Sequence, residues 1–187
     1  MPEYQAPSKM TFLSSSSRKS LQDGNVSIIR VENECHIQEV RILFQEYQRS
    51  LNVDLGFQDF EHELSSLPGE YQSPHGILLL ATVGEEIAGC VALRRLEDEI
   101  CEMKRLYVRS GFRGLKLGRR LAETVIREAI RIGYRLMRLD TLETLIEAMH
   151  LYDSLGFKRV APYYPNPLPG VVYWELDLLT FGLNHTI

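Results

Sequence analysis

The chain has 187 residues, of which 44% are hydrophobic and 25% are charged, values typical of one globular domain with a complete core. Its formal net charge of -4 excludes a general electrostatic attraction to nucleic acid or to an anionic membrane. No apolar run approaches the ~20 residues of a membrane helix, and the polar N-terminus lacks the apolar core of a signal peptide, so we expect a cytoplasmic protein.

Residues 1–24 are polar and serine-rich, which predicts a flexible tail before a single domain over residues 25–187. Cys35, Cys90 and Cys101 show no spacing typical of a metal site or of a regular disulfide framework. They indicate reduced thiols packed as small apolar side chains, and we expect no metal site.

The first part of the domain predicts a strand, two helices and a hairpin. A strand over Asn25–Val31 precedes a helix over Cys35–Leu51, whose apolar residues recur with helical spacing. A shorter helix is predicted within Phe57–Leu67, followed by a loop. Strands over Ile77–Val83 and Glu86–Leu96 meet at a Gly-Glu-Glu sequence typical of a hairpin turn.

A further strand over Glu99–Val108 runs into a turn rich in glycine and arginine. The next segment, Gly114–Ile132, has an apolar stripe opposite a charged face and predicts a helix ended by Gly133. A strand over Tyr134–Thr141 follows this helix.

The last part of the chain predicts one helix and two strands. The helix begins at a capping box formed by Thr144 and Glu147 and ends at Gly156. Strands over Phe157–Pro162 and Val171–Leu179 enclose a proline-rich loop. This order of elements predicts a single α/β domain built on a mixed sheet.

The stretch Tyr107–Glu123 combines glycines and cations at the start of a helix, which favours binding of an anion. The spacing of Gly111, Gly114 and Gly118 fits neither a Walker-type phosphate loop nor a dinucleotide fingerprint. The alternative is that these glycines bind no anion and only give the backbone the conformational freedom to start the helix.

A third pattern does fit. Arg113–Gly118 resembles the R/Q-x-x-G-x-G/A signature of the GNAT superfamily of acyl-CoA-dependent N-acyltransferases, and Val108 lies five residues before Arg113, as in that family. Leu151–Phe157 is similar to the family segment LYEKLGF. The resemblance implies a single-domain GNAT fold, a mixed and mostly antiparallel twisted sheet flanked by helices, with a splayed central strand pair.

The resemblance also implies acetyl-CoA as the cofactor. Backbone N–H groups of the turn would bind the pyrophosphate of coenzyme A, and the end of the preceding strand would bind the pantetheine arm as an added strand would. The implied cofactor-binding residues are Leu106, Tyr107, Val108, Arg113, Gly114, Leu115, Lys116, Leu117, Gly118 and Arg119. The family usually has Gly at the position of Lys116, where we expect helical dihedrals and an ammonium that points to solvent or phosphate.

The chemistry requires a base for the amine, a stabilised oxyanion and a donor for the leaving thiolate. The resemblance makes Glu102 the candidate base, with a structural ion pair as the alternative. On a regular strand Glu102 would share a face with Lys104, Leu106 and Val108. A backbone N–H near Leu106 or Tyr107 would meet the oxyanion.

Tyr152 occupies the position that the family uses for the acid, and a merely packed aromatic is the alternative. Tyr163, Tyr164 and Asn166, held by prolines, are implied substrate contacts near the acceptor site. Tyrosines that only shield the sheet edge are the alternative for this loop.

The expected function is N-acetyl transfer from acetyl-CoA to a primary amine of a small molecule or protein, by direct attack in a ternary complex. A non-catalytic acyl-CoA sensor is the rival, because Lys116 and Leu145 replace a usual Gly and a common Asn. The acidic residues Glu61, Glu63 and Glu70 fit either attraction of a cationic amine or an ordinary charged surface. A homodimer is left open.

Overall fold

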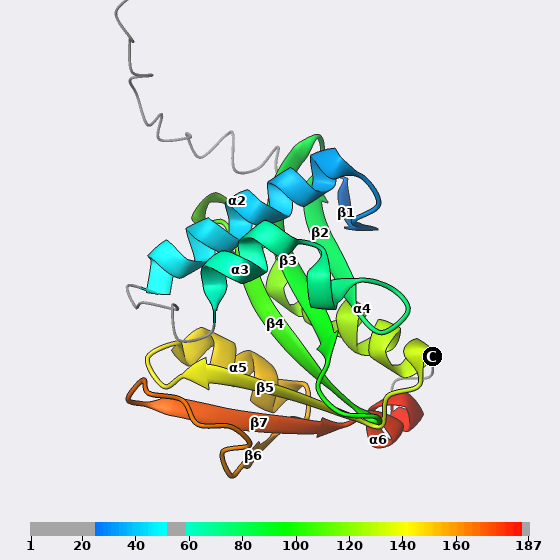
Figure 1. The fold of residues 1–187 in the computed structure, drawn as a ribbon, viewed down its shortest axis with the longest axis vertical. Helices are drawn as coiled ribbons and strands as arrows, with labels where there is room; N and C mark the ends of the chain where they lie inside the picture. The colour runs from blue at the N-terminus through cyan, green and yellow to red at the C-terminus, as the bar shows by residue number, and fades with distance from the viewer. Residues whose placement is uncertain (1–24, 52–58, 185–187) are drawn as a thin grey trace, which may run out of the picture.

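The computed structural model describes residues 25–51 and 59–184, which form a mixed α/β domain (Figure 1). The predicted tail over residues 1–24 and the first two residues of the second predicted helix, 57–58, lie outside this part of the chain. In chain order the elements are β1 (Val26–Arg30), α2 (Glu34–Leu51), α3 (Phe60–Ser66), η2 (Gly69–Tyr71), β2 (Ile77–Val83), β3 (Glu86–Arg95), β4 (Ile100–Val108), η3 (Ser110–Phe112), α4 (Leu117–Ile132), β5 (Leu136–Leu142), α5 (Ile146–Ser154), β6 (Lys158–Val160), β7 (Val171–Asp177) and α6 (Leu178–Asn184).

The strands form one seven-stranded sheet in the order β1-β2-β3-β4-β5-β7-β6. Neighbours pair antiparallel except β4 and β5, which run parallel. The parallel pair is short, because its ladder covers only Ile100–Glu102 against Leu136–Arg138. Both strands continue past this ladder and diverge, as Figure 1 shows. This architecture confirms the predicted fold class, including the splayed central strands.

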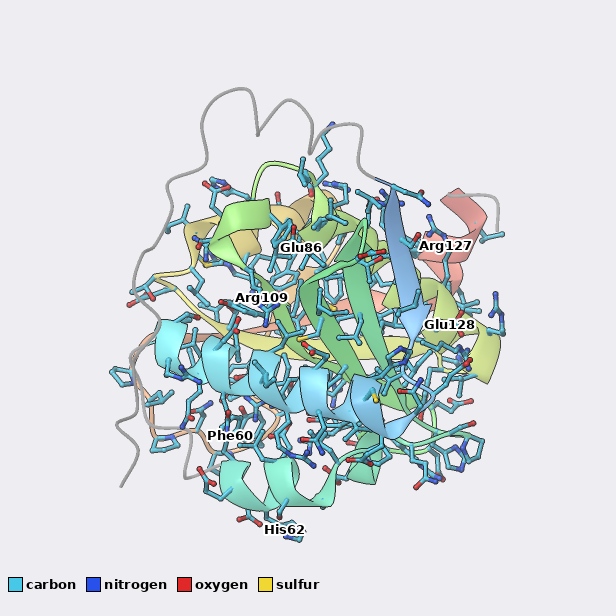
Figure 2. All side chains as sticks on the ribbon, turned by 90° about the horizontal axis from the view of Figure 1, so that it is seen from above. Phe60, His62, Glu86, Arg109, Arg127 and Glu128 are labelled. Atoms are coloured by element: carbon cyan, nitrogen blue, oxygen red, sulfur yellow. The ribbon has the colours of Figure 1, made fainter. Side chains whose placement is uncertain are left out.

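Helices cover both faces of the sheet (Figure 1). On one face, Val40 and Phe44 of α2 pack in a buried cluster with Phe60 of α3, which points from its helix toward the sheet in Figure 2. On the other face, Leu121 and Val125 of α4 belong to a second cluster beneath the sheet. Burial of each large apolar side chain contributes about 1.5–3 kcal/mol, so these two clusters hold the helices in place.

The antiparallel pairing of β3 with β4 is interrupted by a β-bulge. Val91 of β3 faces two residues of β4, Arg105 and Leu106, because the register shifts between their neighbours. Arg105 has a φ of 56°, in the left-handed region that glycine favours. A bulge of this kind twists its strand and leaves one residue outside the ladder.

The bulge reverses the alternation of side chains along β4. Glu102 and Lys104 line a cavity on the α3 side of the sheet, whereas Leu106 and Val108 pack against the core cluster under α4. The prediction that these four side chains share one face is therefore wrong. One extra residue in the strand moves every later side chain to the opposite face.

The start of α5 also differs from the prediction. The helix begins at Ile146, its N-cap is Leu145, and no side chain caps it. The backbone N–H of Leu145 bonds to the carbonyl of Leu142, so the chain turns once more before the helix starts. Thr144 therefore precedes the helix, and the predicted capping box with Glu147 is wrong.

Two smaller corrections concern the cysteines and the C-terminal strand. Cys90 and Cys101 are buried as predicted, but Cys35 is exposed at the start of α2. The final strand ends at Asp177, and Leu178–Asn184 form a short helix instead of its continuation. Within the described ranges, none of the helices combines the length and apolarity required to cross a membrane.

Candidate functional site

The turn between β4 and α4 uses two left-handed residues. Gly114 has a φ of 89°, and Lys116 has φ 57° and ψ 21°. The expectation of helical dihedrals at Lys116 is wrong: this residue is the N-cap, and α4 begins only at Leu117. A left-handed conformation costs a non-glycine residue about 1–2 kcal/mol, which the packing of the flanking elements has to offset.

The first turn of α4 offers backbone donors to an anion. The N–H of Arg120 bonds to the carbonyl of Lys116, so the N–H groups of Leu117, Gly118 and Arg119 precede the first bond within the helix. The first turn contains no acidic residue that would compete for them. A Cβ on Gly114 would meet nothing within 4 Å, so a ligand can approach its backbone closely.

The cations around this turn differ in how far they are already engaged. Arg113 and Lys116 are exposed on either side of Gly114. Arg119 pairs with Glu123 at 3.4 Å and donates to the Ser154 hydroxyl at the end of α5. Arg113 and Lys116 are therefore the better placed of the three to meet a phosphate.

A cavity lies where β4 and β5 diverge, and we call it the splay cavity. Leu106 and Lys104 line it from β4, and Tyr152 lines it from α5. The complete lining is Tyr47, Leu51, Met103, Lys104, Arg105, Leu106, Asp140, Thr141, Leu142, Leu145, Ala148, Tyr152, Leu168 and Val171. Past Glu102, β4 has no ladder to β5, which leaves backbone groups on this edge available to an extended ligand.

Tyr152 is both packed and accessible to this cavity. Its ring contacts Phe157 at a centroid distance of 5.7 Å and Trp174 at 6.3 Å. Burial raises the pKa of its phenol well above the usual value, so the hydroxyl keeps its proton at physiological pH. Tyr152 can therefore donate a hydrogen bond into the splay cavity.

A second cavity of about 390 Å³, the charged cavity, adjoins the first and shares Lys104 and Arg105 with it. Its lining is Glu63, Arg94, Leu96, Glu97, Glu102, Lys104, Arg105, Tyr163, Tyr164 and Pro165. Because Lys104 and Arg105 line both cavities, a ligand in the splay cavity and a ligand in the charged cavity would meet at this part of β4.

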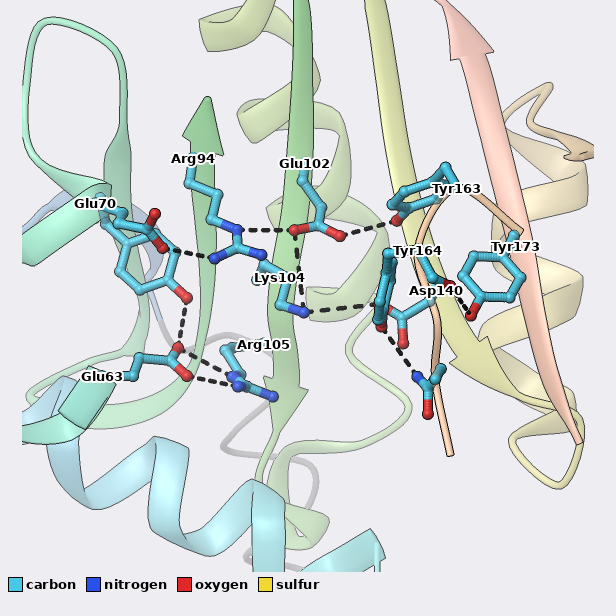
Figure 3. A network of polar contacts seen from close by, with 12 residues as sticks. Glu63, Glu70, Arg94, Glu102, Lys104, Arg105, Asp140, Tyr163, Tyr164 and Tyr173 are labelled. Carbon is cyan, nitrogen blue, oxygen red and sulfur yellow. Dashed lines mark hydrogen bonds and ion pairs between the residues drawn. The ribbon is translucent and has the colours of Figure 1, made fainter. Parts of the chain in front are cut away.

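Glu102 lies fully buried at the centre of a polar network (Figure 3). Arg94 donates to its carboxylate at 2.8 Å, the Tyr163 hydroxyl donates at 2.8 Å, and the Lys104 ammonium lies 4.0 Å away. Burial opposes ionisation, but the charges of Lys104 and Arg94 outweigh it and hold the pKa of Glu102 below its usual value. The carboxylate is thus an ionised partner in a structural ion pair, whatever further role it has.

Arg105 anchors the bulge to α3. Its guanidinium bonds to both carboxylate oxygens of Glu63, at 3.1 and 2.5 Å, and lies 5.2 Å from the centre of the Phe60 ring. Glu63 in turn accepts a hydrogen bond from the Tyr71 hydroxyl. This contact ties the irregular part of β4 to the helix that covers the charged cavity.

The proline-rich loop brings two of its three candidate residues to the charged cavity. Tyr163 and Tyr164 line it, and Tyr163 contacts Glu102 directly. Asn166 does not line the cavity but donates to the Tyr164 hydroxyl at 3.0 Å. Both tyrosines also pack edge-on against Tyr173, so they stiffen the loop as well as facing the cavity.

Sequence reasoning missed several charged residues that shape the site. Arg94, Arg105 and Asp140 contribute to its cavities or its ion pairs, and Asp140 lies 3.6 Å from the Lys104 ammonium. Tyr47 of α2 lines the splay cavity, where burial raises its pKa to about 12. Charged residues within otherwise apolar strands were the available signal for the first three, because such residues are rarely buried without partners.

Comparison with known proteins agrees with this geometry. The family model described as the acetyltransferase (GNAT) family matches residues 37–157. An uncharacterized N-acetyltransferase of Schizosaccharomyces pombe is 43% identical over 160 residues, which cover 84% of this chain and 98% of that protein. The N-acetylaspartate synthetase of Danio rerio is 30% identical over 144 residues, covering 75% of this chain and 51% of that protein.

Solved structures share the fold. An acetyltransferase of Streptococcus agalactiae superposes with a TM-score of 0.69 at 23% identity, over 81% of this chain and 98% of its own. A Salmonella typhimurium protein, determined with its cofactor acetyl-CoA, superposes with a TM-score of 0.59 at 18% identity, over 82% of this chain and 94% of its own. The resemblance found in the sequence is thus confirmed. The chain belongs to the acetyltransferase (GNAT) family, a family of acetyl-CoA-dependent acyltransferases.

Proposed function

We propose that this protein transfers an acetyl group from acetyl-CoA to a primary amine of a small molecule or a protein, by direct attack in a ternary complex. The observation that carries the proposal is the divergence of β4 and β5 past Glu102, which opens the splay cavity just before the glycine- and arginine-rich turn that starts α4. No cysteine or serine is among the described residues that line this cavity, which favours direct attack over an acylated enzyme.

The residues of the turn fit coenzyme A. The N–H groups of Leu117, Gly118 and Arg119 would hold the pyrophosphate, with Leu115 beside them in the same turn and the side chains of Arg113 and Lys116 adding charge. Gly114 keeps this backbone open to the ligand.

The free edge of β4 would hold the pantetheine arm through the backbone of Leu106, Tyr107 and Val108. When bound, acetyl-CoA supplies a thioester whose carbonyl carbon is electrophilic. The bulge places Arg105 and Leu106 opposite the single residue Val91, and a backbone N–H of Leu106 or Tyr107 is the proposed oxyanion donor.

Glu102 is the proposed base, acting through water. The acceptor reaches the enzyme mostly as an ammonium and has to lose one proton before its nitrogen forms the new C–N bond. A carboxylate with a lowered pKa accepts protons weakly, so Glu102 would pass this proton on to solvent rather than keep it. Its negative charge also favours an ammonium in the charged cavity.

Tyr152 is the proposed acid. As the C–S bond breaks, its hydroxyl would donate a hydrogen bond to the leaving sulfur. The nitrogen releases its second proton to solvent and the thiolate takes up one proton from solvent, so that amide, thiol and one released proton are the products. Because burial raises the pKa of Tyr152, this donation is closer to a strong hydrogen bond than to complete proton transfer.

Tyr163 and Tyr164 are proposed to contact the acceptor from the loop, with Asn166 positioning Tyr164. The name of the Danio rerio relative, N-acetylaspartate synthetase, favours the amine of an amino acid as the acceptor.

The experiment is a thiol-release assay with acetyl-CoA and a panel of primary amines, together with thermal unfolding in the presence of coenzyme A. We expect turnover with at least one amine, and intersecting rather than parallel initial-velocity lines when both substrates are varied. Stabilisation by coenzyme A without turnover of any amine would favour the sensor instead. If coenzyme A does not stabilise the protein and no amine turns over, the proposal is refuted.

A further inference from the structure

The three cations of the charged cavity are engaged to different extents. The Nε and Nη2 of Arg105 both donate to Glu63, and the Arg105 side chain is only 4% exposed. Lys104 lies between two carboxylates, 4.0 Å from Glu102 and 3.6 Å from Asp140, and is 8% exposed. Arg94 is the most accessible of the three, with 28% of its side chain exposed.

Arg94 holds an inner and an outer carboxylate (Figure 3). Its Nε donates to Glu102, whose side chain is 1% exposed, and its Nη1 donates to Glu70 at 2.5 Å. The Glu70 side chain is 69% exposed. A guanidinium has five N–H donors in a planar fork, more than these two contacts use.

These two contacts differ in how easily they can be exchanged. The Glu102 carboxylate cannot leave Arg94 without losing the shorter of its two ion pairs in a fully buried position, which is unfavourable. The exposed Glu70 carboxylate can be released to water at small cost, because pairs at the surface are weak. The outer edge of Arg94 is therefore a site where one carboxylate can replace another.

We propose that the acceptor is an amino acid, and that Arg94 binds its carboxylate in place of Glu70. Its amino group then extends toward the carboxylate of Glu102, in the charged cavity that adjoins the splay cavity. A diamine would instead place its second ammonium beside the Arg94 guanidinium. This inference rests on the proposed acetyl transfer and names its acceptor.

Matched acceptors test the carboxylate directly. The panel contains L-amino acids, the corresponding amino acid amides and putrescine, each assayed by thiol release with saturating acetyl-CoA. Rates are compared per neutral amine, because an amide lowers the pKa of its neighbouring amine. We expect kcat/KM for an acid to exceed that for its amide by at least about tenfold, the effect of one charge-assisted hydrogen bond.

Three substitutions and one control then assign this preference to Arg94. In Arg94→Gln, and less completely in Arg94→Lys, the acid-to-amide ratio should fall toward one. The ratio is measured within one variant, so it does not depend on how much of that variant is folded. Glu70→Gln should lower KM for the amino acid, because it removes the competing carboxylate. As the control, Glu97→Gln removes one negative charge from the lining of the charged cavity at a residue that pairs with Arg138 instead of Arg94, and it should lower KM less.

Opposite results overturn the inference. A preference for putrescine or for the amides, or a higher KM for amino acids in Glu70→Gln, would show a site for cationic amines. If amines turn over without preference for a carboxylate, this inference fails and the acetyl transfer stands. If no amine turns over and coenzyme A does not stabilise the protein, both fail.

Discussion

Breaking the contact between Glu63 and Arg105 should destabilise the protein far more than breaking an ion pair at the surface. The side chains of Arg105 and Glu63 are only 4% and 14% exposed, and two N–O contacts join them. Removing one partner of a buried pair costs about 3–5 kcal/mol, and Glu63→Gln should fall near the lower end because glutamine keeps one acceptor oxygen. For a chain of this size, a loss of about 3 kcal/mol corresponds to a fall in Tm of about 6–12 °C.

The assay is thermal unfolding followed by circular dichroism, with Glu99→Gln as the control. Glu99 and its partner Arg135 are 64% and 61% exposed and 3.5 Å apart, so this pair should contribute about 0–1 kcal/mol. Equal falls in Tm for the two variants would refute the reasoning that α3 anchors the bulge through Arg105.

The same pair should make stability depend on pH in a defined direction. Burial opposes ionisation of Glu63, but the hydrogen bonds and charge of Arg105 outweigh it and hold the pKa of Glu63 below its usual value. A carboxyl whose pKa is lowered by folding stabilises the protein above its unfolded pKa, and this stabilisation is lost as the pH falls through the folded pKa. The difference in stability between the wild type and Glu63→Gln should therefore shrink at acid pH, and a difference that grows would contradict the assignment.

Three further predictions concern the reaction and the turn. Glu102→Gln should lower kcat by about a hundredfold or more and leave the Kd for coenzyme A, measured by calorimetry, unchanged. An unchanged kcat would show that Glu102 is not the base and serves only in a structural ion pair. Since the pKa of Glu102 is lowered, the acidic limb of the profile of kcat/KM against pH should follow the pKa of the acceptor amine, which two acceptors of different pKa will show. Lys116→Gly should raise the free energy of unfolding by up to about 1 kcal/mol in thermal unfolding, because glycine adopts the left-handed conformation without strain. The same substitution should weaken coenzyme A binding in calorimetry, because it removes a positive charge. Tighter binding would show that the lysine obstructs the site.

Much of the fold follows from local patterns. The apolar spacing of α2 and α4 reflects one buried face per helix, and the glycine- and arginine-rich turn marks the start of α4. The prediction that β4 and β5 diverge came only from the family resemblance, because no residue at the end of β4 indicates that its partner strand is missing there.

The rest of the site depends on contacts that the chain makes across long distances. Arg105 finds Glu63 42 residues away, and Arg94 finds Glu70 24 residues away, so neither partner could be read from spacing. The bulge at Arg105 shifts the apolar alternation of β4 from Cys101 and Met103 to Leu106 and Val108, all of which pack with the cluster under α4. The prediction assumed one regular strand across this shift, and this is why the faces of Leu106 and Val108 were assigned wrongly. At Lys116, tertiary packing imposed a conformation against the residue's own preference.

A crystal structure of the complex with coenzyme A tests the central claim most directly. The account predicts the pyrophosphate within hydrogen-bond distance of the N–H groups of Leu117, Gly118 and Arg119, and the pantetheine arm along the edge of β4 that faces β5. A pyrophosphate bound elsewhere, or a turn closed by the Lys116 side chain, would contradict it.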